Sequence, residues 1–253
     1  MDRQADKLTS LDRAIDVLEF IYEQGGECSL TAIAHGLGVY KSGVHRALQT
    51  LRARGFVSQD DLTGRYSLGP RLFILGSRVG ENTGLVKALT PAARRLAVQY
   101  GECVHITMPY FGPDTLPRQL LVSKIQNPGS VLTVSPQVGS VTYCHASASG
   151  KCMLAFSPED LLARYTDRPL IALTANTITD WQQLRQQLAL IRQRGYATED
   201  GETELGLSCT GVPCLRRDGS LWGVISISGP TSRIRDLPAE DMVAALQAAA
   251  QTY

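Results

Sequence analysis

The sequence has no long uninterrupted apolar segment. No window of its 253 residues comes close to 18 consecutive apolar residues, so a transmembrane helix is not expected. The first residues, Met1–Lys7, are rich in charge and lead into no apolar stretch of the kind that secretory signal peptides contain. These absences predict a cytoplasmic protein without a membrane partner.

Cysteine is also scarce, and no sign of charge is in excess. The six cysteines form no C-x-x-C pair, which argues against a disulfide framework or a zinc ribbon and favours reduced thiols. They are Cys28, Cys103, Cys144, Cys152, Cys209 and Cys214. Since 25 Lys and Arg residues stand against 24 Asp and Glu residues, any basic surface must be local.

What is present is the composition of a folded globular protein, with 43% hydrophobic and 19% charged residues. The length exceeds the usual range of about 100–200 residues for one domain, which favours two domains. We find no internal repeat and no low-complexity segment. Turn-forming residues at 69–70 and 82–84 flank a short helical pattern, so we expect the domain boundary within residues 69–84.

The first 70 residues predict three helices and a hairpin. The first helix starts at Thr9 or Ser10, and its expected inward face carries Leu11, Ile15, Leu18, Ile21 and Tyr22. Ser29 caps the second helix, and a glycine turn leads to a third helix that starts near Tyr40 and stops at Gly55. Strand patterns at 56–59 and 65–68 enclose a polar turn. This order is that of a helix-turn-helix followed by a wing.

The charge of this region is uneven. Residues 40–80 contain seven basic and two acidic side chains, whereas residues 1–39 contain three basic and seven acidic ones. Positive charge therefore gathers on the third helix and the wing, where DNA phosphates would lie. The candidate DNA-binding residues are Ser29, Tyr40, Lys41, Ser42, Gly43, His45, Arg46 and Arg65. A winged helix that serves only in protein docking or dimerisation is the alternative.

The remainder of the chain alternates helix and strand patterns. Helices are expected at 85–100, from the small-residue stretch 146–151, after Ser157-Pro158, from Thr179-Asp180 to Gly195, and from Pro238. Strands are expected at 103–108, 120–125, 131–134, 210–215 and 221–228, the last two joined by a turn at Asp218-Gly219.

Several motifs together resemble the IclR (isocitrate lyase regulator) family of bacterial transcription factors. In the first half they are SLDRAIDVL at 10–18, GVYKSGVHRAL at 38–48 and GRYSLG at 64–69. In the second half they are HASASGK at 145–151, TITD at 177–180, RGYA at 194–197, GLSC at 206–209 and SISGPTSR at 226–233. The similarity extends over nearly the whole chain.

The resemblance implies an α+β protein with a winged helix-turn-helix DNA-binding domain over residues 8–70, a linker helix over 71–84, and a GAF- or profilin-like effector-binding and oligomerisation domain over 85–253. It implies a homodimer or a dimer of dimers that binds palindromic double-stranded operator DNA and a small, often carboxylated, effector, without a cofactor. Carried over position by position, the implied effector-binding residues are Ala148, Ser149, Glu199, Cys209, Ser226 and Ser228.

The chemistry of these residues agrees with that implication. Backbone amides of the Ala-Ser-Ala-Ser-Gly turn can approach an anion at a helix start, where the helix dipole favours negative charge. Ser226 and Ser228 stand at i and i+2 of an expected strand and so share one face. Close packing of small residues, and serines that bond to neighbouring backbone, are the structural alternatives.

The chain departs from the usual family pattern at several places. Tyr40 stands where proline is common and Gly43 where threonine is common, so the operator sequence cannot be transferred. The stretch 110–127 is longer or more irregular than usual, and 141–144 replaces a more aliphatic segment. The effector, and the choice between repression and activation, stay open.

Residues for two other functions are present in the sequence. A metal or redox sensor could use Cys103, His105, Cys144, His145, Cys152, Cys209 and Cys214, although their spacing is no known ligand signature. An enzyme could pair Cys209 with His105 or His145 as thiol and imidazole. No nucleophile motif and no third orienting group support catalysis, so we expect neither an enzyme nor a metal site.

Overall fold

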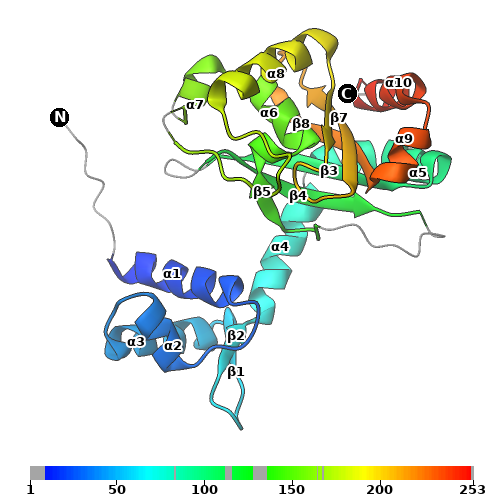
Figure 1. The fold of residues 1–253 in the computed structure, drawn as a ribbon. Coiled ribbons are helices and arrows are strands. Elements are labelled where there is room, and N and C mark those ends of the chain that lie inside the picture. Colours follow the sequence, from blue (N-terminus) through cyan, green and yellow to red (C-terminus); the bar gives the residue numbers. More distant parts are fainter. Residues whose placement is uncertain are drawn as a thin grey trace. The chain divides into compact units, whose positions relative to one another are not determined.

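We analysed a computed structural model of the chain, shown in Figure 1. It describes residues 9–82, 84–111, 116–127, 136–163, 165–166 and 168–251. The contacts divide the chain into two compact units, and the boundary along the chain lies between residues 82 and 83. No helix of the described residues has the length and apolar character needed to cross a membrane. The expected strand at 131–134 lies outside the described residues.

The first unit is a winged helix-turn-helix, as predicted. It consists of α1 (Thr9–Glu23), α2 (Leu30–Gly36), α3 (Lys41–Ala53), β1 (Val57–Gln59), β2 (Tyr66–Leu68) and α4 (Pro70–Asn82). The two strands pair antiparallel, with Val57 opposite Leu68. The helices enclose a core that includes Val17, Ile21, Ile33, Val44 and Leu48.

The predicted inward face of α1 was wrong in part. Ile21 is buried, but Leu11, Ile15 and Tyr22 are 54%, 46% and 59% exposed. Helix α1 carries two apolar stripes, because Val17 and Ile21 stand four residues apart beside the stripe of Leu11, Ile15 and Tyr22. The Val17 stripe joins the core, and periodicity alone could not choose between the two.

The second unit is a six-stranded antiparallel sheet between helices. The strands lie in the order β5-β4-β3-β8-β7-β6. In chain order the elements are α5 (Gly84–Tyr100), β3 (Cys103–Tyr110), β4 (Arg118–Ile125), β5 (Val141–Tyr143), α6 (Ala148–Ala155), α7 (Glu159–Ala163), α8 (Trp181–Arg194), β6 (Ala197–Asp200), β7 (Leu207–Leu215), β8 (Leu221–Pro230), α9 (Thr231–Asp236) and α10 (Ala239–Ala250). The unit is therefore of the α+β class.

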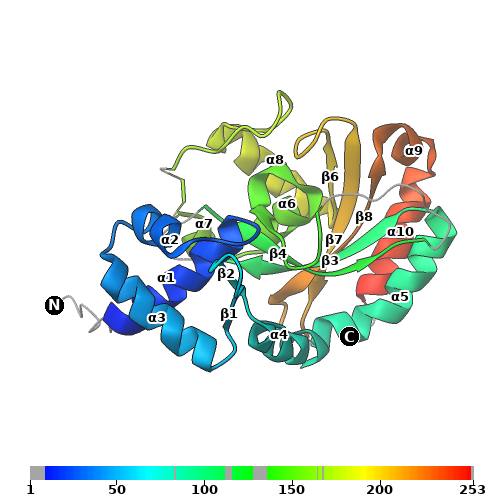
Figure 2. The same ribbon diagram turned by 90° about the horizontal axis from the view of Figure 1, so that it is seen from below.

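The sheet has a hydrophobic core on each face. Helices α5 and α10 cover one face, where Leu89, Val104 and Ile225 pack together. Helices α6 and α8 cover the other face, which Figure 2 shows on the opposite side of the strands, and there Met153 and Leu188 are buried. Alternate residues of each strand thus serve different cores.

The longer predicted elements of this unit are confirmed, as is the short helix α7 expected after Ser157-Pro158, whereas three other short elements were missed. Helix α8 begins after its N-cap Asp180 and ends at Gly195, whose φ of 80° is the left-handed conformation that glycine favours. The pattern analysis did not predict β5, β6 or α9, which have three, four and six residues. Segments this short carry too few residues for a periodic signal.

Candidate functional site

The start of helix α3 presents polar side chains to solvent. Lys41, Ser42, His45 and Arg46 are exposed, and the N-cap Tyr40 is 88% exposed. On the opposite side of the helix Val44, Leu48 and Leu51 are buried. The core therefore fixes the helix and leaves one polar and basic face available for contact with a nucleic acid.

Ser29 and the wing frame this face within the first unit. The Ser29 hydroxyl accepts a hydrogen bond from the amide of Ala32 at 3.1 Å, so it caps α2. In the wing, Asp60 Oδ1 accepts bonds from the amide of Thr63 at 2.6 Å and the amide of Leu62 at 3.0 Å. These bonds lower the pKa of Asp60 below its usual value. The ordered turn ends at Arg65, which is exposed.

Gly43 differs from the other predicted DNA-binding residues because it is buried. A Cβ atom at Gly43 would lie 2.7 Å from Nη1 of Arg13 on helix α1. Arg13 and Arg46 both line a groove between α1 and α3. Arg13 was not among the predicted DNA-binding residues, although this basic residue belongs to the SLDRAIDVL motif.

A polar cavity of about 120 Å³ lies in the second unit between the sheet and the start of α6. Every strand from β3 to β8 contributes a residue to it. Its lining consists of His105, Thr107, Gln119, Leu121, Pro136, Thr142, Ser147, Ser149, Glu199, Thr203, Glu204, Leu207, Cys209 and Ser228. Residues far apart in the sequence therefore meet in one cavity.

Four of the six predicted effector-binding residues line this cavity: Ser149, Glu199, Cys209 and Ser228. Ala148 and Ser226 are buried in the same region but do not line it. Ser226 lies opposite Gly211 of β7 and His105 of β3 in the sheet. Its hydroxyl has no hydrogen-bond partner among the described residues.

A chain of side chains crosses the floor of the cavity. Ser228 Oγ lies 3.0 Å from Cys209 Sγ and 3.4 Å from His105 Nδ1, and His105 Nε2 lies 3.2 Å from Cys103 Sγ. Burial lowers the pKa of His105 to about 4, with a further contribution from Lys124. Burial raises the pKa of Cys209 to about 12. At neutral pH the imidazole is uncharged and the thiol keeps its proton.

Glu199 and Glu204 are the acidic residues among those that line the cavity, and Glu199 is bonded to Glu202 behind it. Burial raises the pKa of Glu199 to about 7, and its Oε2 accepts a hydrogen bond from the amide of Glu202 at 2.9 Å. Glu202 in turn pairs with the fully buried Lys151 of α6 at 2.5 Å. This ion pair connects the loop after β6 to helix α6.

The sequence analysis missed several polar residues of the cavity. Gln119 Nε2 donates to Ser147 Oγ at 2.6 Å and to Thr142 Oγ1 at 3.1 Å. Ser147 is the N-cap of α6 and accepts a bond from the amide of Gly150 at 3.0 Å. Thr107 lies beside them on β3. No motif marks Thr107 or Gln119, which stand in strands that only the sheet order brings to α6.

The cysteines and histidines do not form a metal-binding cluster. Among the described residues, no group of three or more His, Cys, Asp and Glu side chains is arranged to hold a metal ion. All six cysteines are buried, and Cys152 donates to the carbonyl of Gly211 at 3.1 Å. Cys214 belongs to the core on the α5 side, whereas Cys144 belongs to the core on the α6 side.

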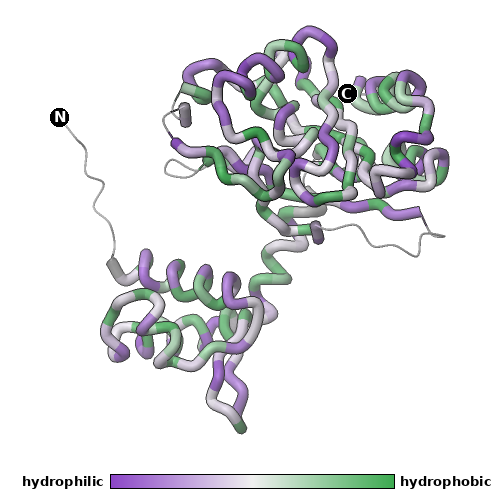
Figure 3. The backbone as a smooth tube through the Cα atoms, viewed as in Figure 1, coloured by the Kyte–Doolittle hydropathy of each residue, from purple (hydrophilic) through white to green (hydrophobic). Residues whose placement is uncertain are grey.

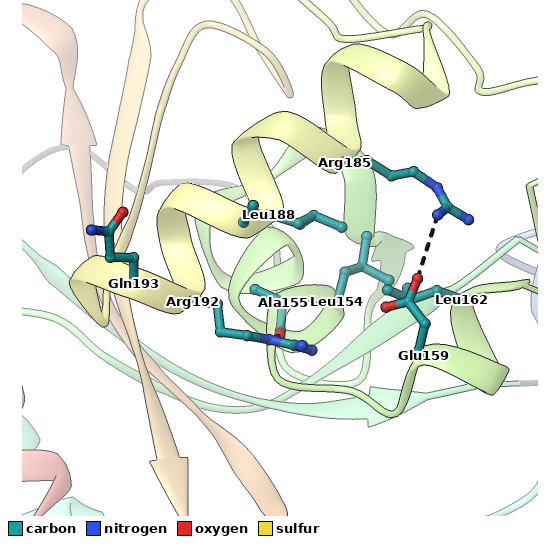
Figure 4. Close-up of a pocket in the computed structure, with 9 residues that line it drawn as sticks. Leu154, Ala155, Glu159, Leu162, Arg185, Leu188, Arg192 and Gln193 are labelled. Carbon is teal, nitrogen blue, oxygen red and sulfur yellow. Dashed lines mark hydrogen bonds and ion pairs between the residues drawn. The ribbon is translucent and has the colours of Figure 1, made fainter.

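A second, larger groove lies between α6, α7 and α8, away from all predicted site residues. Figure 4 shows Leu154, Leu162 and Leu188 at its base. Arg185 and Glu159 pair across it at 3.4 Å, and both side chains are largely exposed. Arg192 donates to the carbonyl of Ala155 at 2.5 Å, so it holds the end of α6.

Comparison with known proteins agrees with this architecture. The model of the IclR helix-turn-helix domain matches residues 10–61, and that of the bacterial transcriptional regulator IclR C-terminal domain matches residues 78–253. The chain belongs to the IclR family. IclR regulators combine a DNA-binding unit with a ligand-responsive one, so the two regions described above are those at which such function is expected.

Three IclR proteins illustrate the similarity. The HTH-type transcriptional regulator BhcR of Paracoccus denitrificans is 35% identical over 230 residues, which cover 90% of this chain and 80% of the relative. The crystal structure of an IclR regulator from Alicyclobacillus acidocaldarius has 30% identity and a TM-score of 0.85 and covers 97% of both chains. An IclR homologue from Microbacterium hydrocarbonoxydans, complexed with 4-hydroxybenzoate, shares the fold at 23% identity, with a TM-score of 0.80 and coverage of 95% of both chains.

Proposed function

We propose that this IclR regulator binds a palindromic operator as a homodimer and that a small carboxylate, bound in the cavity beside α6, changes its affinity for DNA. The observation that carries the proposal is the presence of both an exposed basic face on α3 and a cavity lined largely by polar residues in the second unit. The proposed domains are residues 8–70, the linker 71–84 and residues 85–253.

The DNA-binding part rests on the exposed residues at the start of α3. Arg46 and Lys41 can bond to guanine or to phosphate, while Tyr40, Ser42 and His45 are placed to contact base edges or the backbone. Ser29 and Arg65 are proposed to contact phosphates. Gly43 is proposed to act indirectly, because its missing side chain leaves room for Arg13.

The homodimer is supported by exposed apolar side chains of the first unit. Phe73 and Val79 of α4 are 80% and 69% exposed, and Leu11 of α1 is 54% exposed. Figure 3 shows that much of α4 is hydrophobic. Several large apolar side chains exposed on one unit favour burial against a second copy. Two-fold symmetry would then match a palindromic operator.

The carboxylate is supported by the start of α6. The first amides of a helix lack intrahelical partners, and the helix dipole favours an anion there. Ser149 lies at this helix start and lines the cavity, while Ser228 and Cys209 face it from the sheet. We propose that Ala148 takes part through its backbone and that Ser226 supports Ser228.

The test is a titration of the full-length protein. A duplex selected from a random library serves as the operator probe, and glycerate, pyruvate and 4-hydroxybenzoate serve as carboxylates. We expect one duplex bound per protein dimer, an affinity that changes with a carboxylate, and a rise in the unfolding temperature with the same compound. Binding as a monomer, or DNA affinity and stability indifferent to every carboxylate, would overturn the proposal.

A further inference from the structure

Two buried side chains of the cavity have polar atoms without a partner. Thr107 Oγ1 and Gln119 Oε1 accept or donate no hydrogen bond within the described residues, although Thr107 is only 4% and Gln119 only 5% exposed. In the free protein such atoms bond to water. A ligand that displaces this water must replace its hydrogen bonds or lose affinity.

The orientation of Gln119 determines what this replacement must be. Both hydrogens of its amide nitrogen are engaged, by Ser147 Oγ at 2.6 Å and by Thr142 Oγ1 at 3.1 Å. The amide oxygen that is left can only accept. A ligand that satisfies it therefore brings an O–H or N–H donor.

The acceptor lies beside the position proposed for the carboxylate. Gln119 is bonded to Ser147, which caps the helix whose second residue is Ser149. Thr107 lies on the neighbouring strand, opposite Leu121, which also lines the cavity. A donor group close to the acid in the ligand thus meets the Gln119 oxygen and the Thr107 hydroxyl together.

The rest of the lining indicates the size and type of the ligand. None of the described residues that line the cavity is Phe, Tyr, Trp, Arg or Lys. The imidazole of His105 is thus the one aromatic ring among these lining residues, and they include no Lys or Arg cation to hold a second acid group. The volume of about 120 Å³ is well below the roughly 300–1,000 Å³ of sites for drug-sized ligands.

We infer that the effector is a small aliphatic hydroxy acid and that Thr107 and Gln119 select it by its hydroxyl group. The inference rests on the proposed function, because it assumes that the acid group lies at the start of α6. It adds two specificity-determining residues and a ligand class to that proposal.

Thr107→Val is the sharpest test, because valine keeps the shape of threonine and removes only a hydroxyl that lacks a partner. The free variant is expected to be at least as stable as the wild type. Calorimetric titration compares glycerate with propanoate, which lacks both hydroxyl groups. We expect the wild type to bind glycerate more tightly than propanoate. Thr107→Val should lower the affinity for glycerate about three- to tenfold and leave the affinity for propanoate unchanged.

Two further variants provide a second test and a control. Gln119→Met removes the acceptor and should act in the same direction as Thr107→Val. Thr210→Val is the matched control, since Thr210 is equally buried but follows Cys209 on β7 and therefore faces the other side of the sheet. The control should leave both affinities unchanged.

Each outcome has a separate meaning. Tighter binding of glycerate that is lost in Thr107→Val supports the inference. Equal binding of glycerate and propanoate overturns the hydroxyl selection but leaves a carboxylate-responsive regulator. Binding of 4-hydroxybenzoate alone overturns the aliphatic class and leaves the same function. If none of the three acids binds, both the inference and the proposed carboxylate function fail.

Discussion

The two functional regions of this protein are built on opposite principles. The proposed DNA-binding face consists of exposed side chains from one helix and a hairpin, supported from behind by a small core. The proposed effector cavity is lined by residues of six strands, of the start of α6 and of the adjoining loops, most of them polar and many of them buried. An exposed protein surface can bind DNA with water and ions between the two molecules. A ligand cavity instead selects its ligand through buried polar atoms that have no hydrogen-bond partner until the ligand binds.

The largest effect is expected from a substitution on the exposed apolar surface of the first unit, which should weaken the dimer. Phe73→Asp places a charge where we propose that two copies meet. Burial of a Phe side chain contributes about 1.5–3 kcal/mol, and a buried unpaired charge costs more, so we expect the dimer dissociation constant to rise at least about a hundredfold. Sedimentation velocity measures it.

The control for this change lies on the second unit. Leu190 of α8 is 58% exposed, and Leu190→Asp should leave the dimer intact. An unchanged dimer in the Phe73→Asp variant would place the interface elsewhere.

The next effect concerns the recognition helix. Arg46→Ala removes a side chain that is exposed on α3. Loss of a base or phosphate contact should weaken operator binding about ten- to a hundredfold, with no change in effector affinity. Fluorescence anisotropy at constant salt measures the change.

Arg95→Ala is a suitable control, because Arg95 is exposed on α5 of the other unit. If Arg46→Ala binds the operator as tightly as the control does, Arg46 has no part in DNA recognition.

The cavity is tested by the double variant Ser226→Ala and Ser228→Ala. Ser228 bonds to Cys209 and to His105, and Ser226 has a hydroxyl without a partner. We expect effector affinity to fall about tenfold or more, while DNA binding without effector is retained. Calorimetry with the effector and anisotropy with the operator separate the two properties.

Ser220→Ala, in the turn before β8, provides the control, because the Ser220 hydroxyl bonds within that turn, donating to Asp218 at 2.6 Å and accepting from Arg216 at 3.4 Å. A normal effector response in the double variant would remove both serines from the site.

The contrast between the two regions also explains how far the sequence could predict them. The winged helix was predicted because its periodic helices, glycine turns and basic residues are contiguous in the chain. The stripe of α1 that faces the core was predicted only in part: Ile21 joins the core, but Leu11 and Ile15 are exposed and Val17 takes their place. Where two stripes are equally apolar, only tertiary packing decides.

The cavity was predicted through residues that motifs carry, such as Ser149 and Ser228. Thr107 and Gln119 were not predicted, because they become site residues only when β3 and β4 pair and the N-cap of α6 meets Gln119. That meeting is a long-range contact and leaves no local signal. Glu199 was predicted by resemblance, but its raised pKa depends on burial that the sequence does not display.

The smallest expected effect is on the pH dependence of stability, and it arises from the raised pKa of Glu199. The folded protein holds the proton of Glu199 up to a pH of about 7, while the unfolded chain releases it near the usual value of 4.5. Between these values the folded state binds more protons, so the free energy of unfolding falls as pH rises.

Glu199→Gln removes the titrating group but keeps an oxygen that can accept from the amide of Glu202. The variant should therefore lose this part of the pH dependence and be more stable than the wild type at pH 8 by about 1 kcal/mol, and chemical denaturation at pH 5 and pH 8 measures it. Glu204→Gln is the control, because Glu204 also lines the cavity but is exposed rather than buried. Parallel stability curves of the wild type and Glu199→Gln would show that Glu199 is ionised in the folded protein, and the cavity would then be as hydrated as the DNA-binding face.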